Sequence, residues 1–238
     1  MNKKFLICGD SWGVGAYQYV GNPPTGITPI ANSGLDYFLT QHNCEVTNIA
    51  KGADSNFLQL VALDSKLEEN SNYDFIVWIQ TETNRDLVDS SEQYPHFDIN
   101  NFKKSMSYVK DTNYQYIQSI YNKFQIPFIV VGGLSAIDDS ISKYTFAKVI
   151  ISSWLTDITE GKYKLAENMH QDIILKVLTL FPPSNKEFII EELDRMRVVE
   201  DSLETHPNFS NGVHPNAQQF EKLAVRILNE LELQFQAS

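Results

Sequence analysis

A serine near the start of the chain lies between small residues, in the sequence G-D-S-W-G at positions 9–13. It directly follows the apolar run Phe5-Leu6-Ile7-Cys8, so we expect Ser11 in the turn after a first strand. Ligands of parallel α/β sheets bind at the carboxyl ends of strands, and flanking glycines permit the tight turn that exposes a nucleophile. The tripeptide G-D-S alone is more typical of a turn or a helix cap. Other residues must therefore supply the rest of the chemistry.

Three further residues stand in similar places. Gly52, in the stretch from Asn48 to Asn56, follows a second predicted strand, and Asn84 follows a third. His214 lies in N-G-V-H-P, just before the last predicted helix. A serine hydroxyl needs a base for acyl transfer, and histidine can act as that base near neutral pH. Taken singly, these residues would be a turn glycine, a loop cap and a surface histidine.

The four blocks together, in this order, resemble those of the SGNH or GDSL hydrolases, and they extend over most of the chain. G-x-S-x-G also fits the nucleophile elbow of α/β-hydrolases, but that elbow normally follows several strands, and here only one precedes it. The resemblance implies that Ser11 is the nucleophile and His214 the base. It implies an oxyanion hole made by the backbone N–H groups of Ser11 and Gly52 and by the Asn84 side chain. The expected activity is hydrolysis of an ester, with O-acetyl carbohydrates or small acyl esters as substrates.

The chain departs from the family pattern at three positions. Asn211 stands where the pattern has the aspartate of the triad, Glu82 replaces a glycine, and Arg85 replaces an aspartate. An asparagine can donate the wrong hydrogen bond to the histidine, and in one protease this change costs about 10⁴ in kcat. We therefore expect a backbone carbonyl to orient His214, or a Ser-His dyad. A nearby carboxylate, Asp201 or Glu204, and deamidation of Asn211 are the alternatives.

Two residues have competing interpretations. The guanidinium of Arg85 could hold a carboxylate or phosphate of the substrate, but a salt bridge with Glu82 or Asp86 is the more ordinary expectation. His206 is also followed by Pro-Asn, but position three before it is Leu203 and no long amphipathic helix begins there. His214 is therefore the preferred base.

The surrounding pattern predicts the elements that position these residues. Four short apolar runs, at 4–9, 45–49, 74–79 and 126–132, indicate buried parallel strands, and 147–153 is a weaker candidate for a fifth. Helical spacing separates them at 33–41, 57–67 and 100–124, and continues at 162–180, 187–203 and after Pro215, with a break at 181–185. This alternation predicts a three-layer α/β/α, flavodoxin-like domain of about five parallel strands over residues 1–238, with a helical C-terminal third.

Composition limits the function classes. The chain has 238 residues, 42% of them hydrophobic, and a net charge of −11, which disfavours general binding to nucleic acid or anionic membranes. We expect no signal peptide or membrane span, hence a cytoplasmic or other intracellular protein. Cys8 and Cys44 are expected as reduced thiols, and neither a cofactor nor a metal is required.

Two other functions compete with the esterase. A binding module that keeps the fold but has lost efficient turnover would explain the changes at Asn211, Glu82 and Arg85. A flavodoxin-like nucleotide or flavin binder would use the first loop for phosphate, but Asp10 in that loop disfavours an anionic ligand. The oligomeric state is not indicated by the sequence.

Overall fold

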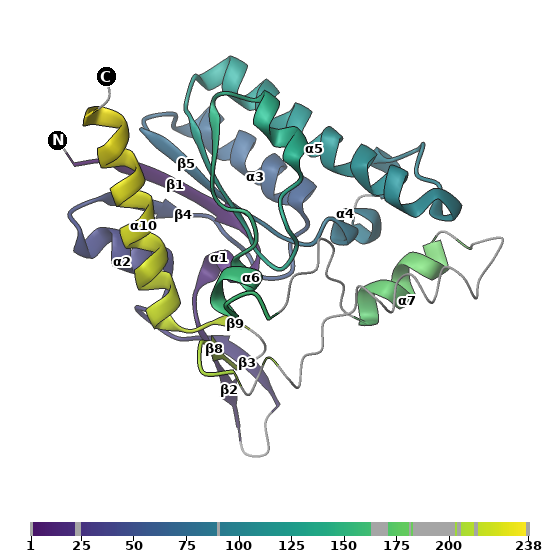
Figure 1. Cartoon of the computed structure of the whole chain (residues 1–238), viewed down its shortest axis with the longest axis horizontal. Helices are drawn as coiled ribbons and strands as arrows, with labels where there is room; N and C mark the ends of the chain where they lie inside the picture. The colour runs from purple at the N-terminus through teal and green to yellow at the C-terminus, as the bar shows by residue number, and fades with distance from the viewer. Residues whose placement is uncertain are drawn as a thin grey trace.

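The computed structural model describes residues 2–21, 25–89, 91–162, 171–180, 182, 203, 206–211 and 214–236. A parallel sheet forms its centre (Figure 1), with the strands β1 (Lys4–Gly9), β4 (Glu45–Asn48), β5 (Phe75–Gln80), β6 (Phe128–Gly132) and β7 (Ala147–Ile151). Their spatial order is β4-β1-β5-β6-β7, which is the 2-1-3-4-5 order of flavodoxin-like sheets. The predicted fold class is confirmed, including the fifth strand.

The strands are apolar throughout because both faces of the sheet are covered. Along β1, Phe5 and Ile7 belong to one core layer, whereas Leu6 and Cys8 belong to the other. Helices α2 (Leu35–Gln41) and α10 (Ala217–Gln236) cover the first face, and α3 (Asn56–Glu69) and α5 (Phe102–Phe124) cover the second (Figure 1). These four helices match predicted helical segments to within a few residues at each end.

The last helix follows the predicted amphipathic pattern. Phe220, Leu223 and Ile227 of α10 are fully buried against the sheet. Burial of such side chains stabilises a fold by about 1.5–3 kcal/mol each. Because α10 begins two residues after Pro215, this packing also fixes the segment that carries His214.

An antiparallel hairpin between α1 and α2 was not expected from the sequence. It consists of β2 (Tyr17–Val20) and β3 (Gly26–Pro29), with Tyr17 opposite Pro29. The remaining elements are short or peripheral: α1 (Ser11–Val14), α4 (Asn84–Asp89), α6 (Trp154–Ile158), α7 (Gln171–Leu180), β8 (Phe209–Ser210), β9 (His214–Pro215) and the 3₁₀ turns at Ser91–Gln93, Ile99–Asn101 and Asp139–Lys143.

Some predictions fall on residues outside the described ranges. Of the helix predicted at 162–180, the structure describes α7, whereas most of the helix predicted at 187–203 and of the break at 181–185 lies outside. The alternative carboxylates Asp201 and Glu204 also lie outside. Cys8 and Cys44 are buried free thiols, as expected. No helix in the described part of the chain is long and apolar enough to cross a membrane.

Candidate active site

Ser11 is held at the carboxyl end of β1 by a tight turn. Asp10 is the N-cap of α1, and its side chain accepts a hydrogen bond from the Trp12 N–H at 2.9 Å. Gly13 allows the turn to approach the neighbouring loop, because a Cβ there would lie 2.8 Å from the Cβ of Ala50. Ser11 is therefore the first residue of a helix that begins directly at the sheet edge.

The loop after β4 brings Gly52 beside Ser11. The Lys51 N–H donates to the Gly9 carbonyl at 3.0 Å, and the Asn48 side chain donates to the Gly13 carbonyl at 3.0 Å. A Cβ placed on Gly52 would lie 3.9 Å from the Ser11 Cβ and 3.7 Å from the Tyr17 hydroxyl. Neither the Ser11 nor the Gly52 N–H has a hydrogen-bond acceptor among the described residues. Both donors thus remain available to a ligand.

Asn84 begins α4, immediately beyond the carboxyl end of β5. Its side chain is fully buried, and neither its Oδ1 nor its Nδ2 has a partner among the described residues. A buried amide without partners costs about 1–3 kcal/mol. The protein therefore maintains an unsatisfied donor next to the edge at which Ser11 lies.

Asp86 joins the two loops that follow β4 and β5. Its carboxylate accepts from the Phe57 N–H at 2.7 Å, from Asn56 at 3.2 Å and from Asn113 at 2.8 Å. Asn56 also pairs with both backbone polar groups of Thr81, at 2.9 and 3.2 Å. Burial raises the pKa of Asp86 to about 6, although these hydrogen bonds oppose the rise. The start of α3, the start of α4 and the middle of α5 are thereby fixed to one another.

A second buried cluster connects the serine turn with the Asn84 loop. The Thr81 hydroxyl lies 2.6 Å from Asp10 Oδ2 and is also in contact with Glu82 Oε2. Glu82 forms a two-pronged ion pair with Arg85, with Nε–Oε2 at 2.9 Å and Nη2–Oε1 at 3.2 Å. Arg85 thus makes the expected salt bridge, with Glu82 rather than Asp86 as its partner. Burial raises the pKa of Asp10, and Glu82 raises it further, against the opposing charge of Arg85.

His214 is oriented by the backbone. Its Nδ1 lies 3.2 Å from the carbonyl oxygen of Asn211, and because a carbonyl only accepts, this nitrogen carries the hydrogen. The Nε2 of His214 is then the basic nitrogen. On the other side, the imidazole stacks on the Tyr17 ring, with centroids 4.0 Å apart and planes at 29°. The Tyr17 N–H and the His214 carbonyl both bond to the Ser210 hydroxyl, at 3.0 Å each.

The structure brings His214 to the same edge of the sheet as Ser11. Helix α1 packs against β9, and Tyr17 reaches from the His214 ring to the space above Gly52. The described contacts do not include a hydrogen bond between the Ser11 hydroxyl and His214. Catalytic hydrogen bonds are often long in unliganded enzymes and tighten when substrate binds.

His206 is engaged elsewhere. Its Nδ1 accepts from the Asn208 N–H at 3.3 Å, and its ring packs edge-on against Phe209 with centroids 5.7 Å apart. Phe209 in turn packs against Trp12. His206 therefore packs, through Phe209, behind the Trp12 side chain of α1.

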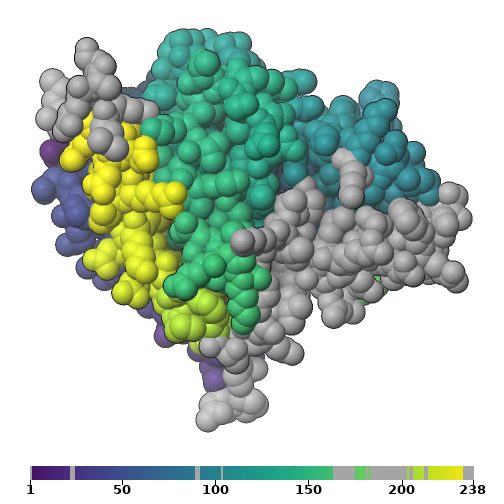
Figure 2. Space-filling model, in the orientation of Figure 1, coloured from purple at the N-terminus to yellow at the C-terminus, as the bar shows by residue number. Residues whose placement is uncertain are grey.

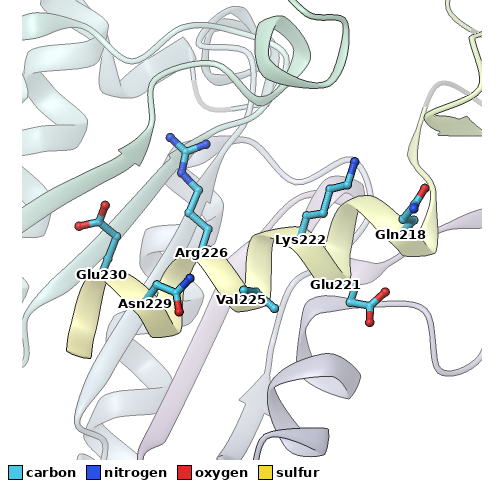
Figure 3. A pocket seen from close by; sticks show the side chains of 7 residues that line it. All are labelled: Gln218, Glu221, Lys222, Val225, Arg226, Asn229 and Glu230. Carbon is cyan, nitrogen blue, oxygen red and sulfur yellow. The ribbon is translucent and has the colours of Figure 1, made fainter. Parts of the chain in front are cut away.

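No group of three or more His, Cys, Asp or Glu side chains within the described ranges could hold a metal ion. Two surface hollows lie away from these residues. One, of about 590 Å³, lies along β7 and the turn at Asp139–Lys143. The other, of about 510 Å³, lies on the outer side of α10, which runs at the surface beside the segment around residue 150 (Figures 2 and 3). Its side chains are mostly polar and come from one helix, with Arg226 and Glu230 engaged in ion pairs to Asp157 and Lys148.

Sequence reasoning missed several residues of this region. Tyr17 was missed because the hairpin that carries it was not expected. Thr81 was missed because a single threonine between Gln80 and Glu82 has no distinctive pattern. Asn56 lies in the stretch from Asn48 to Asn56 that carries Gly52, but the sequence suggested no role for it. Asp86 was considered only as a partner for Arg85, which instead pairs with Glu82. No local pattern marks the role of Asp86, because its donors Phe57 and Asn56 lie 29 and 30 positions earlier in the chain, at the start of α3.

No family model and no curated protein sequence matches the chain. Among solved structures, it is similar to a carbohydrate acetylesterase family member from Sinorhizobium meliloti, at 12% identity and a TM-score of 0.45, over 97% of this chain and 98% of that one. It is similar to TesA, at 12% identity and a TM-score of 0.43, over 96% and 98%. It is also similar to a catalytic mutant of Axe2, an acetylxylan esterase from Geobacillus stearothermophilus, at 10% identity and a TM-score of 0.42, over 97% and 95%.

Proposed function

We propose that this protein is a serine ester hydrolase of the SGNH type, in which Ser11 is the nucleophile and His214 the general base. The observation that carries the proposal is the meeting, at one edge of the sheet, of a serine at a helix start, a histidine whose Nε2 is basic, and a buried amide with no hydrogen-bond partner among the described residues. The resemblance of the four sequence blocks to that family supports the same roles.

In the proposed reaction, the Ser11 Oγ attacks the ester carbonyl carbon while its proton passes to His214 Nε2. The imidazolium then protonates the alcohol oxygen as the C–O bond breaks, and a water molecule hydrolyses the acyl-enzyme by the same route. The Asn211 carbonyl takes the place of the triad carboxylate, because it fixes the tautomer through Nδ1. It carries no full negative charge, so it stabilises the imidazolium less than an aspartate would.

The negative charge on the tetrahedral intermediate falls within reach of three donors. These are the N–H groups of Ser11 and Gly52 and the Asn84 Nδ2, all of which lack acceptors among the described residues. Preorganised donors of this kind are worth about 10²–10³ in rate each. The fixed hydrogen bonds of Asp86 and Asn56 keep the loops that carry Gly52 and Asn84 in place.

O-acetylated carbohydrates and small acyl esters are the proposed substrates. The similar solved structures include a carbohydrate acetylesterase family member and an acetylxylan esterase. The buried carboxylate of Glu82 neutralises the charge of Arg85, which weakens its attraction for an anionic substrate. A neutral substrate is therefore the better expectation.

The test is a panel of p-nitrophenyl acyl esters and acetylated sugars, assayed with wild type, Ser11→Ala, His214→Ala and His206→Ala. The proposal expects turnover by wild type and by the His206 variant, and a loss of at least about 10³ in kcat for the other two. Loss only with His206→Ala would reassign the base. Equal turnover by Ser11→Ala would eliminate the serine mechanism.

A ligand-binding module is the second candidate, favoured by the neutral Asn211 carbonyl that contacts His214 Nδ1 where a triad would have a carboxylate. It expects saturable binding of an acetylated sugar by calorimetry with no hydrolysis after prolonged incubation. Release of acetate under the same conditions would exclude it.

A further inference from the structure

The Thr81 hydroxyl lies between two buried carboxyl groups. Its oxygen is 2.6 Å from Asp10 Oδ2 and in hydrogen-bond contact with Glu82 Oε2, and all three residues are at most 2% exposed. A hydroxyl has one proton to donate, and an ionised carboxylate only accepts. If both acids were ionised, one of these contacts would join two oxygens with no hydrogen between them. One of the two carboxyls must therefore hold a proton.

The contacts of each acid indicate which one holds it. Glu82 receives two hydrogen bonds from the Arg85 guanidinium, through both of its oxygens, which is the arrangement of an ionised carboxylate. Asp10 uses Oδ1 to accept from the Trp12 N–H, which leaves Oδ2, the oxygen that faces Thr81, to carry the hydrogen. Burial also raises the pKa of Asp10, which favours its protonated form.

We propose that Asp10 is protonated in the folded protein and is a positioning residue, donating from Oδ2 to Thr81, whose hydroxyl donates in turn to ionised Glu82. The chain of hydrogen bonds then has one direction, and the cluster of Asp10, Glu82 and Arg85 has no net charge. It links the turn that carries Ser11 to the loop that carries Asn84.

The protonation of Asp10 should also affect the proposed esterase reaction. This effect on activity, unlike the protonation itself, rests on the proposed function. Asp10 is adjacent to Ser11 in the chain, so an ionised carboxylate there would oppose the negative charge that develops on the ester oxygen. The groups that face Asp10 are Glu82 and Arg85 from the Asn84 loop and Tyr17 from the hairpin, whose own pKa is raised by burial and by Asp10. Ionisation of Asp10 at alkaline pH should therefore lower kcat/KM.

The direct test is infrared spectroscopy at pH 7.5, where a protonated carboxylic acid gives a C=O band distinct from that of a carboxylate. Asp10→Asn should remove one such band from the wild-type spectrum. Asp138→Asn is the matched control, because Asp138 caps a short helix in the same way, by accepting from the N–H two residues on, but has a lowered pKa. Loss of a band only in the Asp10 variant supports the proposal, and an unchanged band overturns it whether or not the protein is an esterase.

Activity and stability supply the second readout. Asn copies the protonated acid, accepting from Trp12 and donating to Thr81, so Asp10→Asn should keep kcat/KM at pH 7 within about threefold and abolish any alkaline decline. Glu82→Gln removes the charge that Arg85 needs, and should lower the melting temperature more than Asp10→Asn does. A larger drop in melting temperature for Asp10→Asn than for Glu82→Gln would assign the proton to Glu82. Equal drops would assign it to neither acid, and either result would overturn the proposal. Failure of Asp10→Asn to fold would also contradict the proposal, because an asparagine should reproduce the hydrogen bonds of a protonated Asp10.

Discussion

The pH dependence of stability offers a sharp prediction for Asp86. This carboxyl is fully buried, and its pKa rises from an ordinary value of 3.8 to about 6 because burial disfavours its charge. Between these values the folded protein holds a proton that the unfolded chain has released. The resulting stabilisation is fully present below the ordinary pKa and is lost as pH rises through about 6.

The size of the effect follows from the pKa difference. Each pKa unit corresponds to about 1.4 kcal/mol, so the free energy of unfolding should lose about 3 kcal/mol in all, of which about 2 kcal/mol falls between pH 4 and pH 7. Asp86→Asn cannot ionise and therefore lacks this loss. Its amide cannot accept from all three donors of Phe57, Asn56 and Asn113, which adds a roughly constant cost of about 1–3 kcal/mol.

The assay is urea unfolding followed by circular dichroism, for wild type and Asp86→Asn at pH 4, 5, 6 and 7. The stability advantage of wild type over the variant should shrink by about 2 kcal/mol across this range, because all other titrating groups cancel in the difference. A difference that stays constant to within about 0.5 kcal/mol would refute the raised pKa of Asp86.

The remaining predictions concern the proposed catalytic groups, each measured as ester turnover alongside the melting temperature. Asn84→Ala should lower kcat by about 10²–10³ without loss of stability, since its amide has no hydrogen-bond partner among the described residues to lose; an unstable variant would contradict this. Gly52→Ala should lower kcat/KM at least about tenfold by filling the space beside the serine, with an unchanged melting temperature because its Cβ meets nothing closer than 3.7 Å. Tyr17→Phe should retain activity within about twofold, whereas Tyr17→Ala should lower kcat about tenfold by freeing the His214 ring; equal effects would exclude the stacking role. Asn211→Asp should change kcat less than about threefold, because it is the backbone carbonyl that contacts His214, and a gain of a hundredfold or more would show that the side chain is what matters.

The sheet and its covering helices could be predicted because their signals are local. The run before Ser11 is continuously apolar, as a strand covered on both faces must be, and the stripe from Phe220 to Leu231 has helical spacing. The hairpin strands β2 and β3 could not, since they are only four residues each and mostly exposed, so they carry no buried apolar run.

The site was predictable only in part, for a related reason. Ser11, Gly52 and Asn84 follow strands, so topology alone places them at one edge of the sheet. The contact between Asp10 and Thr81 joins residues 71 positions apart, and the orientation of His214 depends on a backbone carbonyl, which has no signature in the side-chain sequence. The two departures from the family pattern at Glu82 and Arg85 form one ion pair, which is one of the two salt bridges expected for Arg85.

Covalent labelling with a fluorophosphonate tests the esterase claim most directly. Such a probe reacts only where a serine is activated, and peptide mass spectrometry identifies the modified residue. We predict a single phosphonate on Ser11 in wild type, and none in Ser11→Ala or His214→Ala. No adduct on folded wild-type protein, or labelling at Ser11 that survives in His214→Ala at the same rate, would contradict the proposed serine and histidine pair.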